Sequence, residues 1–258
     1  MQRLHVATLW ISTLLVSIKT LYNKSTKFSV LRHTHCFVCR QSSYVLVCRY
    51  CQQDTPIPLF PVPGHNLLEY EAVYKHLAEP HYEGLFALGS YSGVLVGLIN
   101  QLKFSGKPLA ANVLSGFFYQ YLHLRMLFTN NLPEALIPIP LSKFRYLKRE
   151  YNQSRLLAEK LGEYFDIPVI DALARTRHTK QQATLGKEQR LINIENAFKL
   201  VANITVDSVA VVDDVVTTGA TVNAACKQIQ LAYPDISIRV WCMAVTLNKN
   251  ETASELRL

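Results

Sequence analysis

Short apolar runs separated by turn residues predict a chain of strands with helices between them. Residues 85–96 combine alternating apolar positions with two glycines, which indicates a strand, a turn and the start of a helix. The remaining strand candidates are apolar runs at residues 135–140, 197–201, 209–212 and 236–246. The two prolines in residues 135–140 suit the end of a strand or an edge strand.

Apolar residues at helical spacing connect these strands. In residues 94–104 the apolar positions recur at i, i+3, i+4 and i+7, and residues 109–128 form a longer apolar helix pattern. Asn152 can cap a third helix with one apolar face, and residues 221–232 form a fourth helix. Strands that alternate with helices favour an α/β fold, with a mostly parallel sheet covered by helices on both faces.

Length and composition allow one large domain and a small module. The chain has 258 residues, of which 49% are hydrophobic, so a sizeable core can form and global disorder is disfavoured. Four prolines and a glycine in residues 56–68 indicate an ordered linker. We therefore expect four segments: an apolar N-terminal extension (1–30), a cysteine-rich module (31–60), a linker (61–84) and an α/β domain (85–250).

The net charge of +8 is concentrated in one part of the chain, because residues 143–190 hold eleven basic and six acidic residues. A localised basic surface favours an anionic partner, which can be a phosphorylated metabolite, a nucleic acid or both. The alternative is a solvated basic face without a specific partner.

The N-terminal extension contains a mostly apolar stretch of 15 residues, 4–18. This stretch is shorter than the ~20 residues of a membrane-spanning helix, and no small-x-small cleavage site follows it. Export would also expose the cysteines of the next module to oxidation. We expect a non-essential extension or a wrongly assigned start, hence a cytoplasmic protein without a stable membrane span. An amphipathic helix and a true signal or anchor are the alternatives.

Four of the six cysteines form two Cys-x2-Cys pairs, Cys36 with Cys39 and Cys48 with Cys51. Two such pairs supply the four thiolates of a tetrahedral structural Zn²⁺ site in a reducing compartment. Disulfides or unligated cysteines are the alternative. Cys226 and Cys242 stand apart from this pattern and are expected in the core.

Residues 209–222 carry the most specific chemical pattern in the chain. A β-branched run ends in Asp213 and Asp214, and a hydroxyl-rich loop with Gly219 then leads into a helix. Ligands of parallel sheets bind beyond the carboxyl ends of the strands, and the unpaired N–H groups of a helix start suit a phosphate. The pattern predicts a site for a ribose diol next to a 5′-phosphate. The alternative is that the aspartates only cap the helix.

This segment resembles the 5-phosphoribosyl-1-pyrophosphate (PRPP) loop of type I phosphoribosyltransferases. The family that combines such a loop with N-terminal cysteine knuckles is the ComF family, which includes ComFC and GntX-like proteins. Residues 138–153 resemble its Pro-Val-Pro-Leu…Arg…Arg-Gly-Phe-Asn-Gln segment, with Glu150 in place of glycine. Residues 175–198 resemble its flexible loop, and residues 91–104 resemble a helix that ends in Lys-Phe or Lys-Tyr.

The resemblance implies a type I phosphoribosyltransferase-like parallel sheet, preceded by a small zinc ribbon. It implies that Asp213 and Asp214 form the catalytic pair, which holds the ribose diol of PRPP. It implies Zn²⁺ as a structural cofactor and Mg²⁺ as a cofactor bound with PRPP. The ligand-binding residues that it implies are Val215, Val216, Thr217, Thr218, Gly219, Ala220 and Thr221 around the 5′-phosphate, and Arg145 and Arg149 at the pyrophosphate.

Arg175, Arg177 and Arg190 allow two functional interpretations. They lie in a polar, basic stretch that could close over the pyrophosphate and exclude water. Together with Tyr146, Tyr151 and His178, the same basic loops could follow the backbone of single-stranded DNA and stack its bases. The resemblance to competence proteins favours DNA, and it implies a DNA-uptake helicase as a partner. Solubilising loop charges are the alternative.

We therefore expect a ComF-type competence or DNA-utilisation protein that binds PRPP with Mg²⁺. Whether it is also an enzyme that transfers the phosphoribosyl group stays open. One alternative is a non-enzymatic DNA-uptake adaptor that uses the PRPP fold as a scaffold. The other is a nucleobase salvage phosphoribosyltransferase, which is disfavoured because no base-recognition hood is identifiable after Ala135.

Overall fold

The structure is a computed structural model. The chain forms two compact units, Met1–Gln52 and Gln53–Leu258. The N-terminal extension expected at residues 1–30 lies outside the described residues. Among the helices that are described, none is both long enough and apolar enough to cross a bilayer. The described residues are 35–54, 65–77, 80–104, 109–129, 132–141, 146, 149–176 and 197–246.

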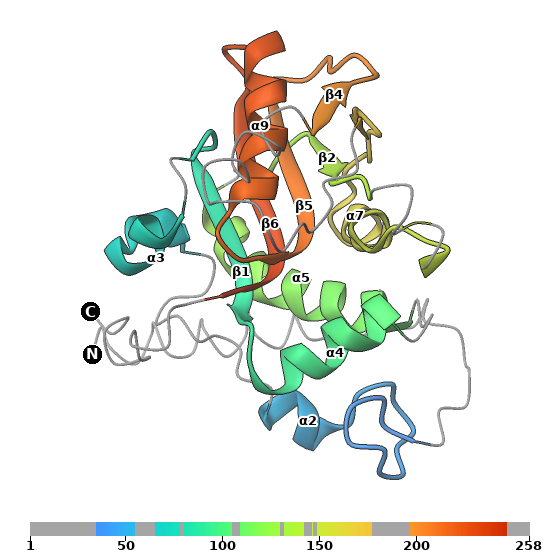
Figure 1. Cartoon of the computed structure of the whole chain (residues 1–258). Helices are drawn as coiled ribbons and strands as arrows, with labels where there is room; N and C mark the ends of the chain where they lie inside the picture. The colour runs from blue at the N-terminus through green and yellow to red at the C-terminus, as the bar shows by residue number, and fades with distance from the viewer. Residues whose placement is uncertain are drawn as a thin grey trace, which may run out of the picture. The chain divides into compact units, whose positions relative to one another are not determined.

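The larger unit is built on a parallel sheet of four strands (Figure 1). The strands follow the order β1-β6-β5-β2, and an isolated parallel bridge joins Val169 to Leu136 of β2. The register of β5 and β6 pairs their residues one to one, and Val212 of β5 lies opposite Trp241 of β6. The strand bounds are β1 (Gly84–Ser90), β2 (Ala135–Pro138), β5 (Ser208–Val216) and β6 (Ser237–Val245).

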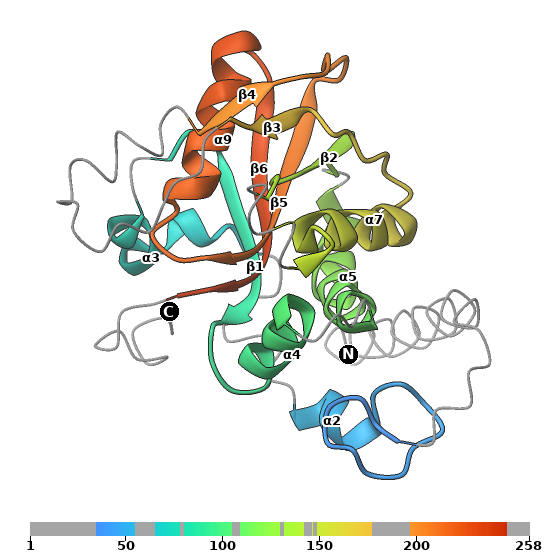
Figure 2. The ribbon, with the colours of Figure 1, turned by 45° about the vertical axis from the view of Figure 1, so that its right-hand side comes forward.

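Helices cover both faces of this sheet, which confirms the expected α/β fold. Helix α9 (Ala220–Ala232) lies on one face, and α5 (Leu109–Thr129) and α7 (Gln153–Phe165) lie on the other (Figures 1 and 2). Successive residues of β6 point to opposite faces because the side chains of a strand alternate. Trp241 packs 5.5 Å from Phe118 of α5, whereas Cys242 belongs to the buried cluster on the α9 face.

The segment before β1 contributes to the core of the larger unit. It contains the short helices η1 (Leu67–Glu69) and α3 (Glu71–His76). Both lie within residues 61–84, which the sequence pattern predicts to be a linker. Asn66 ties this segment to the sheet, because its Oδ1 accepts hydrogen bonds from the N–H groups of Leu68 and Leu85. The residues of this segment that are buried with β5 and β6 are Leu67, Tyr70, Val73 and Tyr82.

A second, antiparallel pair of strands accompanies the main sheet. It consists of β3 (Leu173–Arg175) and β4 (Phe198–Leu200), which pair residue for residue. The apolar run at residues 197–201 predicts β4, whereas no such run marks β3, which is also three residues long. Most of the stretch between them lies outside the described residues.

Candidate functional site

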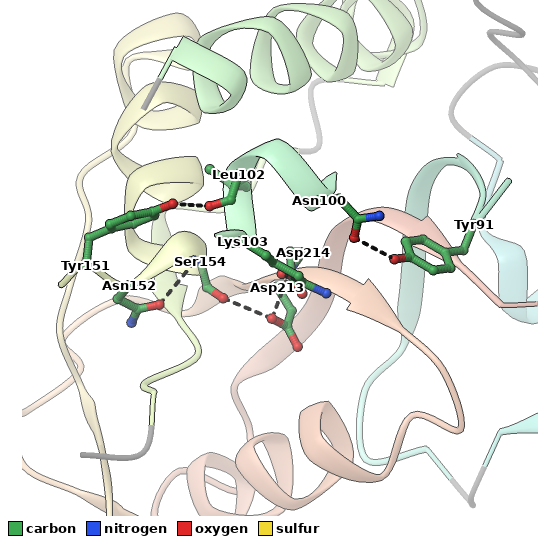
Figure 3. A network of polar contacts seen from close by, with 9 residues as sticks. All are labelled: Tyr91, Asn100, Leu102, Lys103, Tyr151, Asn152, Ser154, Asp213 and Asp214. Atoms are coloured by element: carbon green, nitrogen blue, oxygen red, sulfur yellow. Dashed lines mark hydrogen bonds and ion pairs between the residues drawn. The ribbon is translucent and has the colours of Figure 1, made fainter. Parts of the chain in front are cut away.

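Two adjacent carboxylates near the end of β5 form the centre of a polar network (Figure 3). The carboxylate of Asp213 accepts hydrogen bonds at Oδ1 from the Ser154 hydroxyl (2.9 Å) and from the backbone N–H of Asp214 (2.8 Å). The carboxylate of Asp214 instead forms an ion pair with Lys103, with 3.1 Å between Oδ2 and Nζ. Each aspartate is therefore held by a different helix of the fold.

Helix α7 supplies the serine, and its start is set by Asn152. The Asn152 side chain accepts a hydrogen bond from the N–H of Ser154 at the first turn, as expected for an N-cap residue. Its Nδ2 donates to the carbonyl oxygen of Ile139 just beyond β2, at 2.9 Å. One side chain thus begins the helix, ties it to the sheet and places the Ser154 hydroxyl against Asp213.

Lys103 comes from the last turn of α4 (Gly93–Phe104) and is partly buried in the network. The side chains of Lys103 and Asp214 are 19% and 12% exposed, so this ion pair is far less screened by water than a surface pair. The ammonium group also lies 5.9 Å from the ring centre of Tyr91, whose hydroxyl donates to Asn100. Tyr91 and Asp214 together hold Lys103 over the end of the sheet.

The loop before α7 is attached to the same end of α4. The Tyr151 hydroxyl donates a hydrogen bond to the carbonyl oxygen of Leu102, and the Arg149 guanidinium lies 5.0 Å from the ring centre of Phe104. Glu150, between these two residues, has a positive φ of 64°. This left-handed conformation favours glycine, the residue found here in the resembling family. The glutamate therefore keeps a backbone geometry that suits glycine better.

The pKa of Asp213 is raised to about 7. The largest cause is burial, and the second is the negative charge of Asp214. The hydrogen bonds from Asp214 and Ser154 and the charge of Lys103 act in the opposite direction. Without a ligand, Asp213 therefore keeps a proton up to near-neutral pH. A cation or a pair of hydroxyl donors at this point would favour its ionised form.

The turn after β5 begins α9 without any side-chain cap, so neither aspartate caps this helix. Gly219 stands at the N-cap position with φ 74°, and its carbonyl accepts the first helical hydrogen bond from the N–H of Asn223. A Cβ at Gly219 would lie 2.9 Å from Leu77 Cδ2, the movable end of a side chain, so the positive φ is the stronger reason for glycine here. Thr217 and Thr218 are exposed beside it.

The structure brings most of the predicted site residues in the described range to one end of the sheet. Asp213, Asp214 and residues 215–221 lie on β5 and at the start of α9, and Arg149 is attached to α4. Arg175 lies elsewhere, at the end of β3, with its guanidinium 5.2 Å from the ring centre of Phe198. Arg145, Arg177 and Arg190 lie outside the described residues.

Sequence reasoning missed two contacts of the aspartates, those from Lys103 and Ser154. The signal for Lys103 was present, because the resemblance at residues 91–104 ends in Lys103 and Phe104. Ser154 offered no signal beyond its place two residues after the helix cap. Its role depends on how α7 packs against β5.

The smaller unit carries a compact group of four cysteines, Cys36, Cys39, Cys48 and Cys51. Their sulfur atoms all lie within 4.8 Å of one another, and Cys39 Sγ and Cys48 Sγ are 3.8 Å apart. A tetrahedron with Zn–S bonds of ~2.3 Å has an S···S edge of about 3.8 Å, which fits this spacing. The cluster therefore fits a structural Zn²⁺ ion, as the two Cys-x2-Cys pairs predicted.

Backbone donors point at these sulfur atoms. The N–H of Cys48 donates to Cys36 Sγ at 3.3 Å, and the N–H of Cys51, in helix α2 (Arg49–Asp54), donates to Cys48 Sγ at 3.4 Å. Burial raises the pKa of Cys36, but the backbone donors outweigh it and lower this pKa to about 6. Burial and the neighbouring sulfur atoms raise the pKa of Cys51. A bound cation would favour the thiolate form of all four cysteines.

Fold and sites together define a phosphoribosyltransferase-like α/β protein with an N-terminal four-cysteine module. No protein-family model matches the chain. It is 32% identical to competence protein F of Haemophilus influenzae, over 81% of this chain and 96% of that protein. It is 36% identical to the DNA utilization protein YhgH of Escherichia coli O6:H1, over 82% of this chain and 97% of that protein.

A more distant relative is competence protein ComFC of Streptococcus pneumoniae, at 28% identity over 57% of this chain and 61% of that protein. The two more similar relatives are matched over nearly their whole length. The chain therefore belongs to the family of competence protein F and the YhgH and ComFC proteins.

Proposed function

We propose that this chain is a cytoplasmic DNA-utilisation protein that binds PRPP with Mg²⁺ at the end of β5. The observation that carries the proposal is the arrangement of Asp213 and Asp214 directly before the turn at Gly219 and the uncapped start of α9. The names of its relatives, competence protein and DNA utilization protein, support the biological role.

Each part of PRPP has a chemical counterpart in this arrangement. The carboxylates of Asp213 and Asp214 accept hydrogen bonds from the two ribose hydroxyls, and the N–H groups at the start of α9 bind the 5′-phosphate. Arg149, together with Arg145, contacts the pyrophosphate. Mg²⁺, when bound, would neutralise part of the pyrophosphate charge.

Lys103 has a defined role in this proposal. In the unliganded protein its ammonium pairs with Asp214, at 3.1 Å, and so offsets part of the negative charge of the two aspartates. PRPP brings several negative charges to the same place. Lys103 then attracts the anionic ligand, while Tyr91 keeps the side chain over the site.

If the chain is an enzyme, the reaction is transfer of the phosphoribosyl group. The bond between ribose C1 and the pyrophosphate oxygen breaks, pyrophosphate leaves, and the acceptor forms the new bond at C1. The protein contributes by positioning the ribose and by stabilising the charge on the leaving pyrophosphate.

Calorimetry with PRPP and Mg²⁺ tests the site. The double variant Asp213→Asn with Asp214→Asn removes both anionic acceptors, and we expect at least about a 100-fold loss of PRPP affinity. Asp171→Asn is the matched control, since that exposed carboxylate pairs with Arg155 away from the site. Unchanged affinity of the double variant would show that PRPP does not bind there.

We further propose that the protein handles single-stranded DNA, with a DNA-uptake helicase as a partner. Arg175 and exposed Tyr146 support nucleic-acid contacts, together with Arg177 and Arg190. An anisotropy titration with labelled single-stranded DNA tests this part. Arg175→Ala with Arg177→Ala should weaken binding and flatten its salt dependence, because fewer phosphates are neutralised. An unchanged slope against the logarithm of salt concentration would show that these arginines do not contact phosphates.

A non-enzymatic adaptor is the second candidate, and Glu150 is the observation that favours it. An exposed carboxylate beside Arg149 repels a pyrophosphate that the neighbouring arginine attracts. An assay of PRPP-dependent pyrophosphate release, with and without single-stranded DNA, separates the two candidates. Release establishes an enzyme, whereas PRPP binding without release identifies an adaptor.

A further inference from the structure

The smaller unit has an extreme charge composition. No aspartate or glutamate occurs before Asp54, so every charged side chain of residues 1–52 is basic. The unit is thus a second concentration of positive charge in the sequence, in addition to residues 143–190. Its basic residues are Arg3, Lys19, Lys24, Lys27, Arg32, Arg40 and Arg49.

Two tyrosines of this unit extend their rings into solvent. Tyr44 is 99% exposed and Tyr50 is 72% exposed, whereas buried or half-buried positions are usual for residues of this size. Arg40 and Arg49 are exposed as well, and Arg49 directly precedes Tyr50. Exposed rings and guanidinium groups therefore occur together on one small, cysteine-held scaffold.

The backbone under these rings is fixed by local hydrogen bonds. Ser43 Oγ donates to the carbonyl oxygen of Val45 at 2.8 Å and accepts from the N–H of Val45 at 3.2 Å, so Tyr44 lies at the tip of a closed turn. Tyr50 lies between two cysteines of the cluster, Cys48 and Cys51. Rings presented on a fixed backbone lose little conformational entropy when they bind a partner.

We propose that Tyr44, Tyr50, Arg40 and Arg49 form a contact surface for single-stranded nucleic acid. Unpaired bases stack on exposed aromatic rings, and their phosphates are neutralised by nearby cations. The absence of acidic residues from the whole unit fits a polyanion. The inference rests on the proposed role in single-stranded DNA handling, and it adds a site distinct from the arginines of residues 175–190.

The test is a fluorescence anisotropy titration of the full, zinc-loaded chain with labelled (dT)20. Tyr44→Ala with Tyr50→Ala should weaken binding at least about tenfold, because two stacking contacts are lost. Tyr44→Phe with Tyr50→Phe keeps the rings and should bind within about twofold of the wild type. Tyr74→Ala, which removes a 48% exposed tyrosine of α3 in the other unit, is the control and should change nothing.

The salt dependence gives an independent readout. Arg40→Gln with Arg49→Gln should lower the slope of log affinity against log salt by about 1.4, since each phosphate contact on a single strand contributes about 0.7. The tyrosine variant should leave this slope unchanged. Zinc content measured on each variant verifies that the cysteine cluster is intact.

The outcomes separate the inference from the function on which it rests. If the wild type does not bind (dT)20, the proposed handling of single-stranded DNA fails. If the wild type binds and the tyrosine variant binds equally well, only the contact surface is overturned. Binding to vesicles of phosphatidylglycerol and phosphatidylcholine is the last measurement. If the tyrosine variant loses vesicle binding but keeps (dT)20 binding, these tyrosines contact an anionic bilayer and the proposed nucleic-acid surface is overturned.

Discussion

The cysteine cluster and the aspartate network are assembled over very different lengths of chain. All four cysteines come from residues 36–51, whereas the aspartate network joins Lys103 of α4, Ser154 of α7 and Asp214 of β5. The first group is brought together by short turns, and the second by the order of strands in a sheet. A local cluster is therefore predicted by residue spacing, whereas the distant network depends on how the whole domain packs.

The largest effect is expected at the cysteine cluster. Cys36→Ser removes one of four ligands, so we expect loss of bound zinc and unfolding of residues 35–54, since structural zinc contributes roughly 10–16 kcal/mol in small modules. Metal analysis and limited proteolysis measure the change. Because the larger unit has a buried core of its own, its unfolding midpoint in urea should stay the same.

Cys226→Ala is the matched control for this prediction. Cys226 is fully buried in the core of the larger unit and is not one of the four clustered cysteines. The variant should keep one zinc per chain. Zinc retained by Cys36→Ser would show that the four cysteines do not act as one site.

The next effect in size concerns the ion pair of Lys103 with Asp214. Lys103→Met leaves a mostly buried carboxylate without its cation, and we expect a loss of about 2 kcal/mol in the free energy of unfolding, measured in urea. Lys75→Met is the control, because Lys75 pairs with Glu71 on the surface with side chains 72% and 80% exposed. That change should stay below about 0.5 kcal/mol. Equal effects of the two substitutions would contradict a buried, stabilising pair at the site.

Asp213 should make the unliganded protein less stable as the pH rises. Its folded pKa of about 7 lies above the ordinary value of 3.8, so the folded state binds the proton more tightly than the unfolded state. This contribution is fully present below pH 3.8 and is lost as the pH rises towards 7 and above.

Asp213→Asn mimics the protonated form and should raise the free energy of unfolding by about 1 to 2 kcal/mol at pH 8. The gain should nearly disappear at pH 3.5, where the carboxyl group is mostly protonated in both states. Thermal unfolding at the two pH values measures it. An equal shift at both would show that ionisation of Asp213 is not the cause.

The smallest effect concerns the backbone of the loop before α7. Glu150→Gly relieves a left-handed conformation at φ 64°, and we expect a gain of about 0.5 to 1 kcal/mol in the free energy of unfolding. Glu159→Gly, in the middle of α7, should instead lose about 1 kcal/mol. Chemical denaturation measures both variants. The same sign for both substitutions would show that the conformation of residue 150 is not strained.

Residue patterns predicted most of the elements around the site. The pattern at residues 221–232 matches α9 to one residue, and Asn152 caps α7 as predicted. Such features depend on neighbours within one or two turns of chain. The β3 strand was not predicted, because its three residues end in a charged arginine and form no apolar run. The burial of Leu67 and Tyr70 was not predicted either, because a proline-rich segment does not indicate what it packs against.

The amino-acid sequence by itself determined the α/β alternation, the four-cysteine spacing and the strand-turn-helix with its two aspartates, since each is a short-range pattern. Only the tertiary structure decided that Lys103 pairs with Asp214 and that Ser154 bonds to Asp213. These contacts join the ends of α4, α7 and β5, and sequence distance does not specify the strand order β1-β6-β5-β2 that brings them together. The physical reason is that side chains far apart in the chain meet only through the packing of the elements that carry them.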